Sequence, residues 1–375
     1  MRENWTYKKL GEVATFINGY AFKPDQWKDS GTPIVRIQNL NNPEAPYNYY
    51  DGEVPDKVKI KDGDLLISWS ASLGTYIWKG GDAFLNQHIF KVEFNKLDVD
   101  KMFLKYAVTS KLDAMAQLVH GATMKHIVKK DFDNTLIPYP SLSVQQSIVS
   151  ELDKINELMS LKKAQLSDLD ALAQSIFYDM FGDIDDDTPL SHFISSLGGG
   201  KSLAGKDSCI NKVLKTGAVS FDYFDGNSVK DLPLDYVPLQ EHLLKDGDLL
   251  VSRMNTPELV GSCAYVWKAP NNTYLPDRLW RATLKQGNNP IYLWFSIIQL
   301  KSKEQIRSLA SGTSGSMKNI SKPRFLSVKI KNAPLSLQQD FAKRIELIEQ
   351  QKAQISSTIK DLETLLASRM QYWFD

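Results

Sequence analysis

The chain has 375 residues, which is too long for one ordinary domain and favours two or three. Hydrophobic residues make up 42% and charged residues 24%, a balance that supports folded cores and excludes wholesale disorder, while the formal net charge of +1 argues against a histone-like polycation. Two cysteines are too few for a disulfide framework or a Cys-rich zinc site. Because no apolar stretch approaches the roughly 20 residues that cross a bilayer, and the N-terminus lacks a signal-peptide core, we expect a multidomain cytoplasmic protein with no membrane partner.

Residues 1–142 predict a first α/β domain. Short β-rich runs such as 33–37 and 65–69 are punctuated by turn signals such as Asp62-Gly63, and a helical stretch follows near 102–119. Residues 143–183 then predict one long helix, because apolar residues recur at spacings of three and four, the average period of a coiled coil.

The second half of the chain repeats this order. The acidic run 183–187, followed by Thr188-Pro189, is interpreted as a linker that leads into a second α/β domain at residues 184–335, with a helical stretch near 292–309. Residues 336–375 predict a second long helix with the same apolar register. Two unrelated helices, each packing on its own domain, remain the alternative to a coiled coil.

Repeated motifs indicate a tandem duplication. Leu142-Ser143-Val144-Gln145-Gln146 returns 193 residues later as Leu335-Ser336-Leu337-Gln338-Gln339, and Phe181 has its counterpart in Phe374 at the same offset. The sequence Lys-Asp-Gly-Asp-Leu-Leu occurs at 61–66 and again at 245–250. Each unit is therefore a variable segment of about 140 residues followed by a well-kept helix of about 40.

Charge is separated along the chain although the total is near zero. The two helical segments together carry a net charge of −5 and the remainder carries +6. Residues 305–339 contain six basic residues and no acid, which is an expected footprint of phosphate binding, although a solvated basic face would look the same.

The sequence contains no complete catalytic signature among the motifs considered below. Gly199-Gly200-Lys201-Ser202 resembles the end of a P-loop, but Ser195 occupies the place of its first glycine. The stretch 222–228 resembles the cofactor loop of DNA methyltransferases, yet prolines soon follow it and the chain lacks an [ND]-P-P-[YF] motif. Five histidines show no metal-ligand spacing. The sequence therefore favours a recognition protein over an enzyme and predicts no cofactor or metal of its own.

The pattern as a whole resembles the DNA-specificity (S) subunit of type I restriction–modification systems. The resemblance spans nearly the whole chain and rests on the order and duplication of motifs that are weak singly. They are Leu10-Gly11-Glu12-Val13, the G-D-L-L turns, Asn86-Gln87-His88, the loop 120–125 with its echo at 314–318, and the two L-S-x-Q-Q helix entries.

The resemblance implies two tandem α/β target-recognition domains, 1–142 and 184–335, separated by spacer helices 143–183 and 336–375 that form an antiparallel coiled coil with pseudo-twofold symmetry. Each domain would read one half of a bipartite, asymmetric site on double-stranded DNA. The helices would set the spacer and dock two methyltransferase subunits, which bind S-adenosylmethionine and methylate adenine. ATP and Mg²⁺ would be used by a separate restriction subunit.

Candidate DNA contacts divide into phosphate binders and base readers. The loop-to-helix entries could offer backbone N–H groups and a cation to phosphate, with an ordinary helix cap as the alternative, and the basic strip adds Lys322 and Arg324. The entry residues are Gly121, Thr123 and Lys125, then Gly315, Ser316 and Lys318. Polar residues at strand ends are candidate base readers, because Arg pairs with guanine and Asn or Gln with adenine. They are Arg36, Gln38, Asn39, Ser68, Ser70, Ser252, Arg253 and Asn255.

Two other classes of function stay open at this point. One is a protein-interaction scaffold of two α/β modules on a coiled-coil clamp, which a shallow salt dependence of binding would favour. The other is a methyltransferase or nuclease with degenerate motifs, which binding of S-adenosylmethionine by the purified chain would favour.

Overall fold

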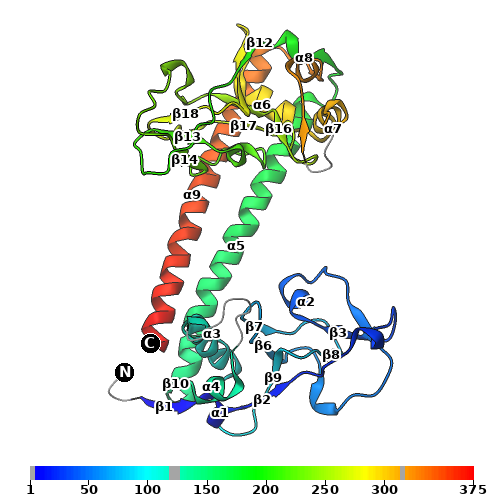
Figure 1. Cartoon of the computed structure of the whole chain (residues 1–375), viewed down its shortest axis with the longest axis vertical. Helices are drawn as coiled ribbons and strands as arrows, with labels where there is room; N and C mark the ends of the chain where they lie inside the picture. The colour runs from blue at the N-terminus through cyan, green and yellow to red at the C-terminus, as the bar shows by residue number, and fades with distance from the viewer. Residues whose placement is uncertain (1–4, 118–126, 313–316) are drawn as a thin grey trace. The chain divides into compact units, whose positions relative to one another are not determined.

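A computed structural model describes residues 5–117, 127–312 and 317–375. The chain divides into two compact units, of which unit 1 comprises Met1–Ala164 with Ser356–Asp375, and unit 2 comprises Gln165–Ile355. Helices α5 (Leu142–Phe181) and α9 (Leu335–Phe374) each contribute one part to either unit (Figure 1). In the described residues, no helix is both long enough and apolar enough to cross a membrane.

The described residues of unit 1 form three small sheets and four α-helices besides the ends of α5 and α9. The sheets have the strand orders β2-β9-β6-β7, β4-β3-β8-β5 and β1-β10. All pairings are antiparallel except β3 with β8, which is parallel. The strands are β1 (Thr6–Lys9), β2 (Thr15–Asn18), β3 (Thr32–Val35), β4 (Asn48–Tyr50), β5 (Lys59–Ile60), β6 (Leu65–Ser68), β7 (Gly74–Ile77), β8 (Ala83–Leu85), β9 (Ile89–Glu93) and β10 (Leu136–Tyr139). The helices are α1 (Leu10–Val13), α2 (Ile37–Asn41), α3 (Lys101–Gln117) and α4 (Lys129–Asn134).

Unit 2 repeats this topology. Its sheets β12-β19-β15-β17, β14-β13-β18 and β11-β21 correspond to the three sheets of unit 1, again with one parallel pair, β13 with β18; a short ribbon, β16-β20, is added. The strands are β11 (Asp186–Pro189), β12 (Ile194–Gly198), β13 (Lys212–Leu214), β14 (Val229–Asp231), β15 (Leu249–Ser252), β16 (Met254–Asn255), β17 (Cys263–Tyr265), β18 (Thr273–Tyr274), β19 (Leu279–Leu284), β20 (Lys318–Asn319) and β21 (Lys329–Lys331). The helices are α6 (Pro290–Ile298), α7 (Leu300–Leu309) and α8 (Lys322–Leu326).

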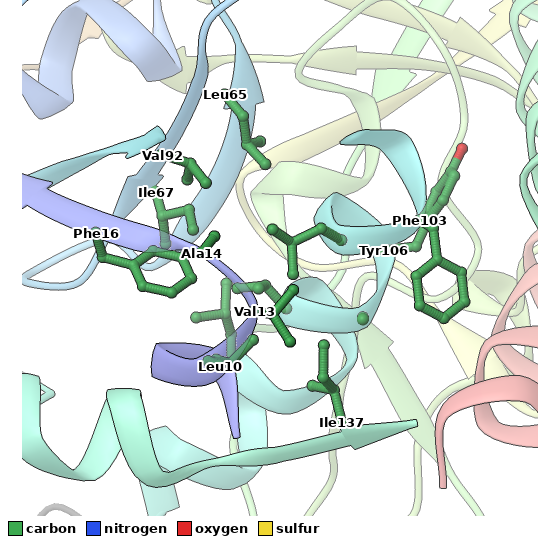
Figure 2. Close-up of a cluster of buried hydrophobic side chains, with 14 of the residues drawn as sticks. Leu10, Val13, Ala14, Phe16, Leu65, Ile67, Val92, Phe103, Tyr106 and Ile137 are labelled. Carbon is green, nitrogen blue, oxygen red and sulfur yellow. The ribbon is translucent and has the colours of Figure 1, made fainter. Parts of the chain in front are cut away.

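The core of unit 1 joins its sheet, its helices and both long helices. Figure 2 shows side chains from α1, β2, β6, β9 and α3 pointing toward one another around Val13 and Ala14. Ile148 and Leu152 of α5 and Phe374 of α9 belong to the same buried cluster. Burying these apolar side chains stabilises the unit by roughly 1.5–3 kcal/mol each, so the start of α5 and the end of α9 are anchored in this core.

The repeated Lys-Asp-Gly-Asp sequence forms the same tight turn in both units. Gly63 and Gly247 have φ values of 87° and 86°, a conformation that favours glycine. The second aspartate of each turn, Asp64 or Asp248, accepts the backbone N–H of the turn's lysine at 3.0 Å and 2.9 Å. The motif recurs because it leads directly into the buried central strand, β6 or β15.

The first glutamine of each L-S-x-Q-Q sequence is a buried link between elements. Gln145 and Gln338 both donate through Nε2 to the carbonyl five residues earlier, at 2.9 Å and 2.8 Å. Through Oε1 they accept the backbone N–H of Asp100 and Asn289 respectively, each at 2.9 Å. The motif therefore fastens the start of each long helix to the segment before α3 or α6.

Within each unit, α5 and α9 pair with opposite chain directions. In unit 1, Glu151 near the start of α5 contacts Arg369 and Trp373 near the end of α9. In unit 2, Phe177 near the end of α5 packs on Phe341 near the start of α9, with ring centroids 5.6 Å apart. The two long helices therefore pair antiparallel in both units, and the mixed helix–sheet class is confirmed.

The structure adds detail to two predictions about unit 2. The segment interpreted as a linker is in part a strand, because Asp186–Pro189 forms β11 and pairs antiparallel with β21. The helical stretch near 292–309 is two helices, since Gln299 adopts an extended conformation between α6 and α7. Its side chain donates to the carbonyl of Phe295 and contacts Gln174 of α5, which stabilises the break.

Candidate nucleic-acid interface

A short ribbon in unit 2 brings three of the predicted contact residues together. Asn255 of β16 lies opposite Lys318 of β20 in the antiparallel register, and the carbonyl of Arg253 accepts the N–H of Ile320 at 2.9 Å. Arg253 is half-buried, and its Nε is a buried donor without a hydrogen-bond partner among the described residues. Among the described residues, Lys318 makes a long contact, 3.4 Å, with the carbonyl of Gly312.

The cations after this ribbon are placed by α8. Lys322 and Arg324 are exposed in its first turn, and Arg324 donates to the carbonyl of Leu309 at 3.1 Å. Lys322 has no hydrogen bond or ion pair with the residues that the structure describes. The ribbon and α8 thus place Arg253, Lys318 and Lys322 on neighbouring segments of unit 2.

The basic strip 305–339 does not form one free surface. Arg307 donates to the carbonyl of Glu258 at 3.1 Å. The ammonium of Lys331 donates to the carbonyls of Gly182 and Ile184, and its side chain is only 13% exposed. These two charges stabilise the fold of unit 2, so the strip offers fewer cations to a ligand than its sequence suggests.

In unit 1, Arg36 is the predicted base reader whose side chain is both partly exposed and held by neighbouring residues. It caps α2, its guanidinium lies 4.9 Å from the ring centroid of Trp27, and its Nη1 donates to Asn48 Oδ1 at 3.0 Å. Gln38 is exposed on the same helix and makes a weak contact with the carbonyl of Pro46 at 3.4 Å. Arg36 is held in one orientation while remaining partly exposed.

Four predicted base readers are buried and leave the candidate interface. Asn39, Ser68, Ser70 and Ser252 are each at most 4% exposed. Asn39 accepts the N–H of Arg36 and donates to the carbonyl of Ala45, while the hydroxyls of Ser68 and Ser252 contact carbonyls two residues along the chain. Ser68 and Ser252 are the last residues of β6 and β15, whose residues are all buried, so their hydroxyls are not accessible to a ligand.

The remaining predicted residues are placed as follows. Asn255 is partly engaged, since its Nδ2 contacts Ser220 Oγ at 3.3 Å and its Oδ1 accepts the N–H of Thr256. Gly121, Thr123, Lys125, Gly315 and Ser316 lie outside the described residues. The proposed role of these loops in phosphate binding stays a prediction.

Three cations that the sequence analysis missed surround a cavity in unit 2. The cavity has a volume of about 400 Å³ and is lined by Ser202, Leu214, Lys215, Thr216, Lys230, Pro276, Asp277 and Arg278. The backbone N–H of Arg253 donates to the carbonyl of Arg278 at 3.0 Å, which joins the cavity to the β16-β20 ribbon. Of the three, only Lys215 directly follows a β-rich run as Arg36 does, because Lys230 lies within β14 and Arg278 directly precedes β19.

The acids around this cavity are already engaged. Asp277 accepts a hydrogen bond from the Ser202 hydroxyl. Asp231, next to Lys230 in β14, pairs with the Lys212 ammonium, which lowers the pKa of the Asp231 carboxyl below its ordinary value, helped by the N–H of Cys209. Neither carboxylate forms an ion pair with Lys215, Lys230 or Arg278 in the described part of the chain.

In the part of the chain that the structure describes, neither the thiols nor the metal-ligand side chains form a catalytic arrangement. Cys209 and Cys263 are buried free thiols, and burial followed by the charge of Asp222 raises the pKa of Cys263 well above its ordinary value. A thiol held protonated in this way is a poor nucleophile. Within the ranges that the structure describes, no three His, Cys, Asp or Glu residues gather as a metal site would require.

Comparison with known proteins finds similarity to one family. Residues 2–170 match the type I restriction modification DNA specificity domain. The EcoBI specificity subunit of Escherichia coli is 27% identical over 171 residues, which cover 45% of this chain and 36% of that subunit. The EcoKI specificity subunit of Escherichia coli K12 is 24% identical over an alignment of 388 residues that covers 92% of this chain and 82% of that subunit.

The fold has a counterpart among solved structures. The S subunit of a type I restriction–modification system from M. genitalium superposes with a TM-score of 0.58 and 13% identity, covering 100% of this chain and 98% of that one. At this identity the likeness concerns the fold alone. Residues 2–170 are thus similar to the type I restriction modification DNA specificity domain, and over nearly its whole length the chain is similar to the specificity subunits of type I restriction enzymes.

Proposed function

We propose that this chain is the DNA-specificity subunit of a type I restriction–modification system, and that each unit reads one half of a bipartite, asymmetric site on double-stranded DNA. The observation that carries the proposal is the repeated topology of two units in a chain related to such subunits. Two copies of one scaffold with different surface residues suit two different half-sites. A protein-interaction scaffold is not favoured, because it does not account for the matched specificity domain.

The long helices supply the second part of the proposal. Each has 40 residues, or about 60 Å of helix at 1.5 Å per residue. They carry exposed apolar side chains such as Leu158, Leu161 and Leu347 outside the buried cores, as a docking surface would. On this proposal the helices set the spacer between the half-sites and dock two methyltransferase subunits, and a restriction subunit joins the same complex.

Catalysis belongs, on this proposal, to the partner subunits. S-adenosylmethionine would bind to the methyltransferase subunits, and ATP with Mg²⁺ to the restriction subunit. The present chain contributes recognition, and its part in the reaction is to hold the target adenine's flanking sequence in register for the partner.

A methyl-transfer assay tests this division of labour. The purified full-length chain is mixed with duplex DNA and labelled S-adenosylmethionine, with and without a type I methyltransferase subunit from the same host. We expect transfer to adenine only when both proteins are present, and no binding of S-adenosylmethionine by this chain alone in calorimetry. Transfer by the chain alone, or transfer by the partner alone at the same sites, would contradict the proposal.

A further inference from the structure

The cavity in unit 2 presents three cations without protein partners. Lys215 and Arg278 are exposed and Lys230 is half-buried. Among the residues that the structure describes, none of the three side chains has a hydrogen bond, an ion pair or a ring contact. Since neighbouring cations repel one another, three unpaired positive charges around one cavity of about 400 Å³ favour an anionic ligand.

The cavity also has polar groups that could recognise more than charge. Thr216 and Ser202 line it, and the Ser202 hydroxyl is directed to Asp277. Asp277 is the one acid in the lining, so the three cations leave a net positive charge of about two there. Phosphates flanking a base edge meet these requirements, because a nucleic acid brings negative charge and hydrogen-bonding groups together.

Strand register identifies the positions of unit 1 that correspond to the cavity residues of unit 2. Ile34 of β3 pairs with Phe84 of the parallel strand β8, and Val213 of β13 pairs with Tyr274 of the parallel strand β18. The equivalence of Ile34 and Val213 makes Arg36 the counterpart of Lys215, since each follows by two residues. Arg36 and Lys215 also occupy the same backbone position, capping the short helix after the strand with ψ of 165° and 159°.

The same register equates the other two cations with polar residues of unit 1. Ile34 pairs with Asn48 on the antiparallel side, as Val213 pairs with Lys230. In unit 1, His88 directly precedes Ile89, which pairs with Ser68 at the end of β6. In unit 2, Arg278 directly precedes Leu279, which pairs with Ser252 at the end of β15. Arg36 and Asn48 are in contact in unit 1, which shows that two of the three positions come together there also.

Unit 1 therefore presents Arg36, Asn48 and His88 where unit 2 presents Lys215, Lys230 and Arg278. Both sets consist of side chains that bind phosphates or base edges, yet no position carries the same residue twice. A scaffold position that is polar in both copies and different in identity is suited to reading two different targets.

Resting on the proposed function, we propose that Lys215, Lys230 and Arg278 form the DNA-reading site of unit 2, with Arg36, Asn48 and His88 as its counterpart in unit 1. Arg278 contacts a base edge, because a guanidinium can pair with guanine through two hydrogen bonds. Lys215 and Lys230 contact the flanking phosphates, because a lysine acts on phosphate as a point charge. The link from Arg278 to Arg253 continues this site onto the β16-β20 ribbon.

The test compares variants of the full-length chain in complex with its methyltransferase subunit. Duplexes carry the bipartite motif of the wild-type complex, or that motif with single bases changed in one half. We expect Arg278→Gln to lose about 5- to 100-fold in affinity for the intact motif and to relax one position of a single half-site. Lys215→Gln and Lys230→Gln should weaken binding to all duplexes alike and reduce the slope of log K against log salt by about 1 each.

Two further variants keep the result interpretable. Arg278→Lys retains the charge but loses the two-bond geometry, so it should keep the salt slope while losing base discrimination. Lys285→Gln removes an exposed lysine at the far end of β19, about 23 Å along the strand from Arg278, and should change neither slope nor motif. The thermal midpoint of each variant is measured to separate loss of binding from loss of folding.

The outcomes separate this inference from the proposed function. A wild-type complex that directs no bipartite motif would overturn both. A wild-type complex that directs a motif, with Arg278→Gln and the two lysine variants retaining wild-type affinity, motif and salt slope, would overturn the reading site alone. If Lys285→Gln lost as much affinity as Lys215→Gln, the reading site would be overturned as well, because a lysine far from the cavity would then contribute equally to DNA binding.

Discussion

The buried glutamines at the helix entries show how a single side chain can account for a repeated motif. Gln338 accepts the N–H of Asn289 and donates to the carbonyl of Ala333, whereas its neighbour Gln339 is exposed. We expect Gln338→Ala to lower the free energy of unfolding of unit 2 by about 1–3 kcal/mol, because it leaves a buried donor and acceptor unpaired. Gln339→Ala should change it by less than about 0.5 kcal/mol. Urea denaturation followed by fluorescence measures both, and equal effects would contradict this account.

A buried carboxyl in unit 2 makes stability depend on pH. Glu349 of α9 is 13% exposed, and its carboxylate lies 2.8 Å from the Lys352 ammonium, which also contacts Asp170 at 2.7 Å and Tyr223. Burial, followed by the charge of Asp170, raises the pKa of Glu349 to about 7. Since this lies above the ordinary value of 4.5, the folded chain binds the proton more tightly than the unfolded chain. The resulting stabilisation is complete below about pH 4.5 and is lost as the pH rises through about 7.

The substitution Glu349→Gln tests this dependence, because glutamine resembles the protonated carboxyl at every pH. We expect the variant to gain stability relative to the wild type between pH 5 and pH 8, by up to about 3 kcal/mol. Asp340→Asn, at an exposed ion pair with Arg344, should show a difference of less than about 1 kcal/mol. Thermal unfolding at several pH values measures both, and a Glu349→Gln difference that stays constant from pH 5 to pH 8 would show the assignment to be wrong.

At the scale of elements, the ends of the long helices belong to the cores of the units. Phe341 is completely buried, and its ring lies 5.3 Å from Phe181 of α5 and 5.2 Å from Phe295 of α6. We expect Phe341→Ala to destabilise unit 2 by about 3–5 kcal/mol through the cavity it leaves. Leu347 of the same helix is 61% exposed, so Leu347→Ala should lower the free energy of unfolding by less than about 0.5 kcal/mol. Similar losses of unfolding free energy for the two variants would contradict the packing described here.

The long helices could be predicted from the sequence because their signal is local and repeated. Apolar residues at three- and four-residue spacing place α5 and α9 within one or two residues of their bounds. The strand β11 could not be found in the same way, since Asp186–Pro189 is polar and becomes a strand only by pairing with β21, about 140 residues later. The break at Gln299 lacks a Gly or Pro signal and depends on contacts with Phe295 and Gln174.

The candidate site was predictable only in part for a related reason. Arg36 and Arg253 were predicted as polar residues at strand ends and Lys318 as the cation of a loop-to-helix entry. All three are partly exposed, and their contact with DNA stays a prediction. Ser68 and Ser252 were misplaced because their strands are central in their sheets and buried on both faces, a property of the neighbouring strands rather than of the residues. Lys215, Lys230 and Arg278 were missed because only the strand register brings three distant segments to one cavity.

At the scale of the whole chain, the duplication separates what is shared from what differs. The two units have corresponding sheets, the same glycine turn and the same buried glutamine. The side chains at equivalent strand ends differ, as between Arg36 and Lys215 or between His88 and Arg278. A shared scaffold with different polar positions suits a protein whose partner is the same at both ends and whose DNA target is not.

The adenine methylome of the host, read by long-read sequencing with and without this gene, tests the central claim most directly. We expect deletion to remove one motif made of two short defined blocks around a fixed gap, and reintroduction of the gene to restore it. The Arg278→Gln variant should restore a motif altered in one block only. A methylome that is unchanged by deletion in cells that express the protein would contradict the account.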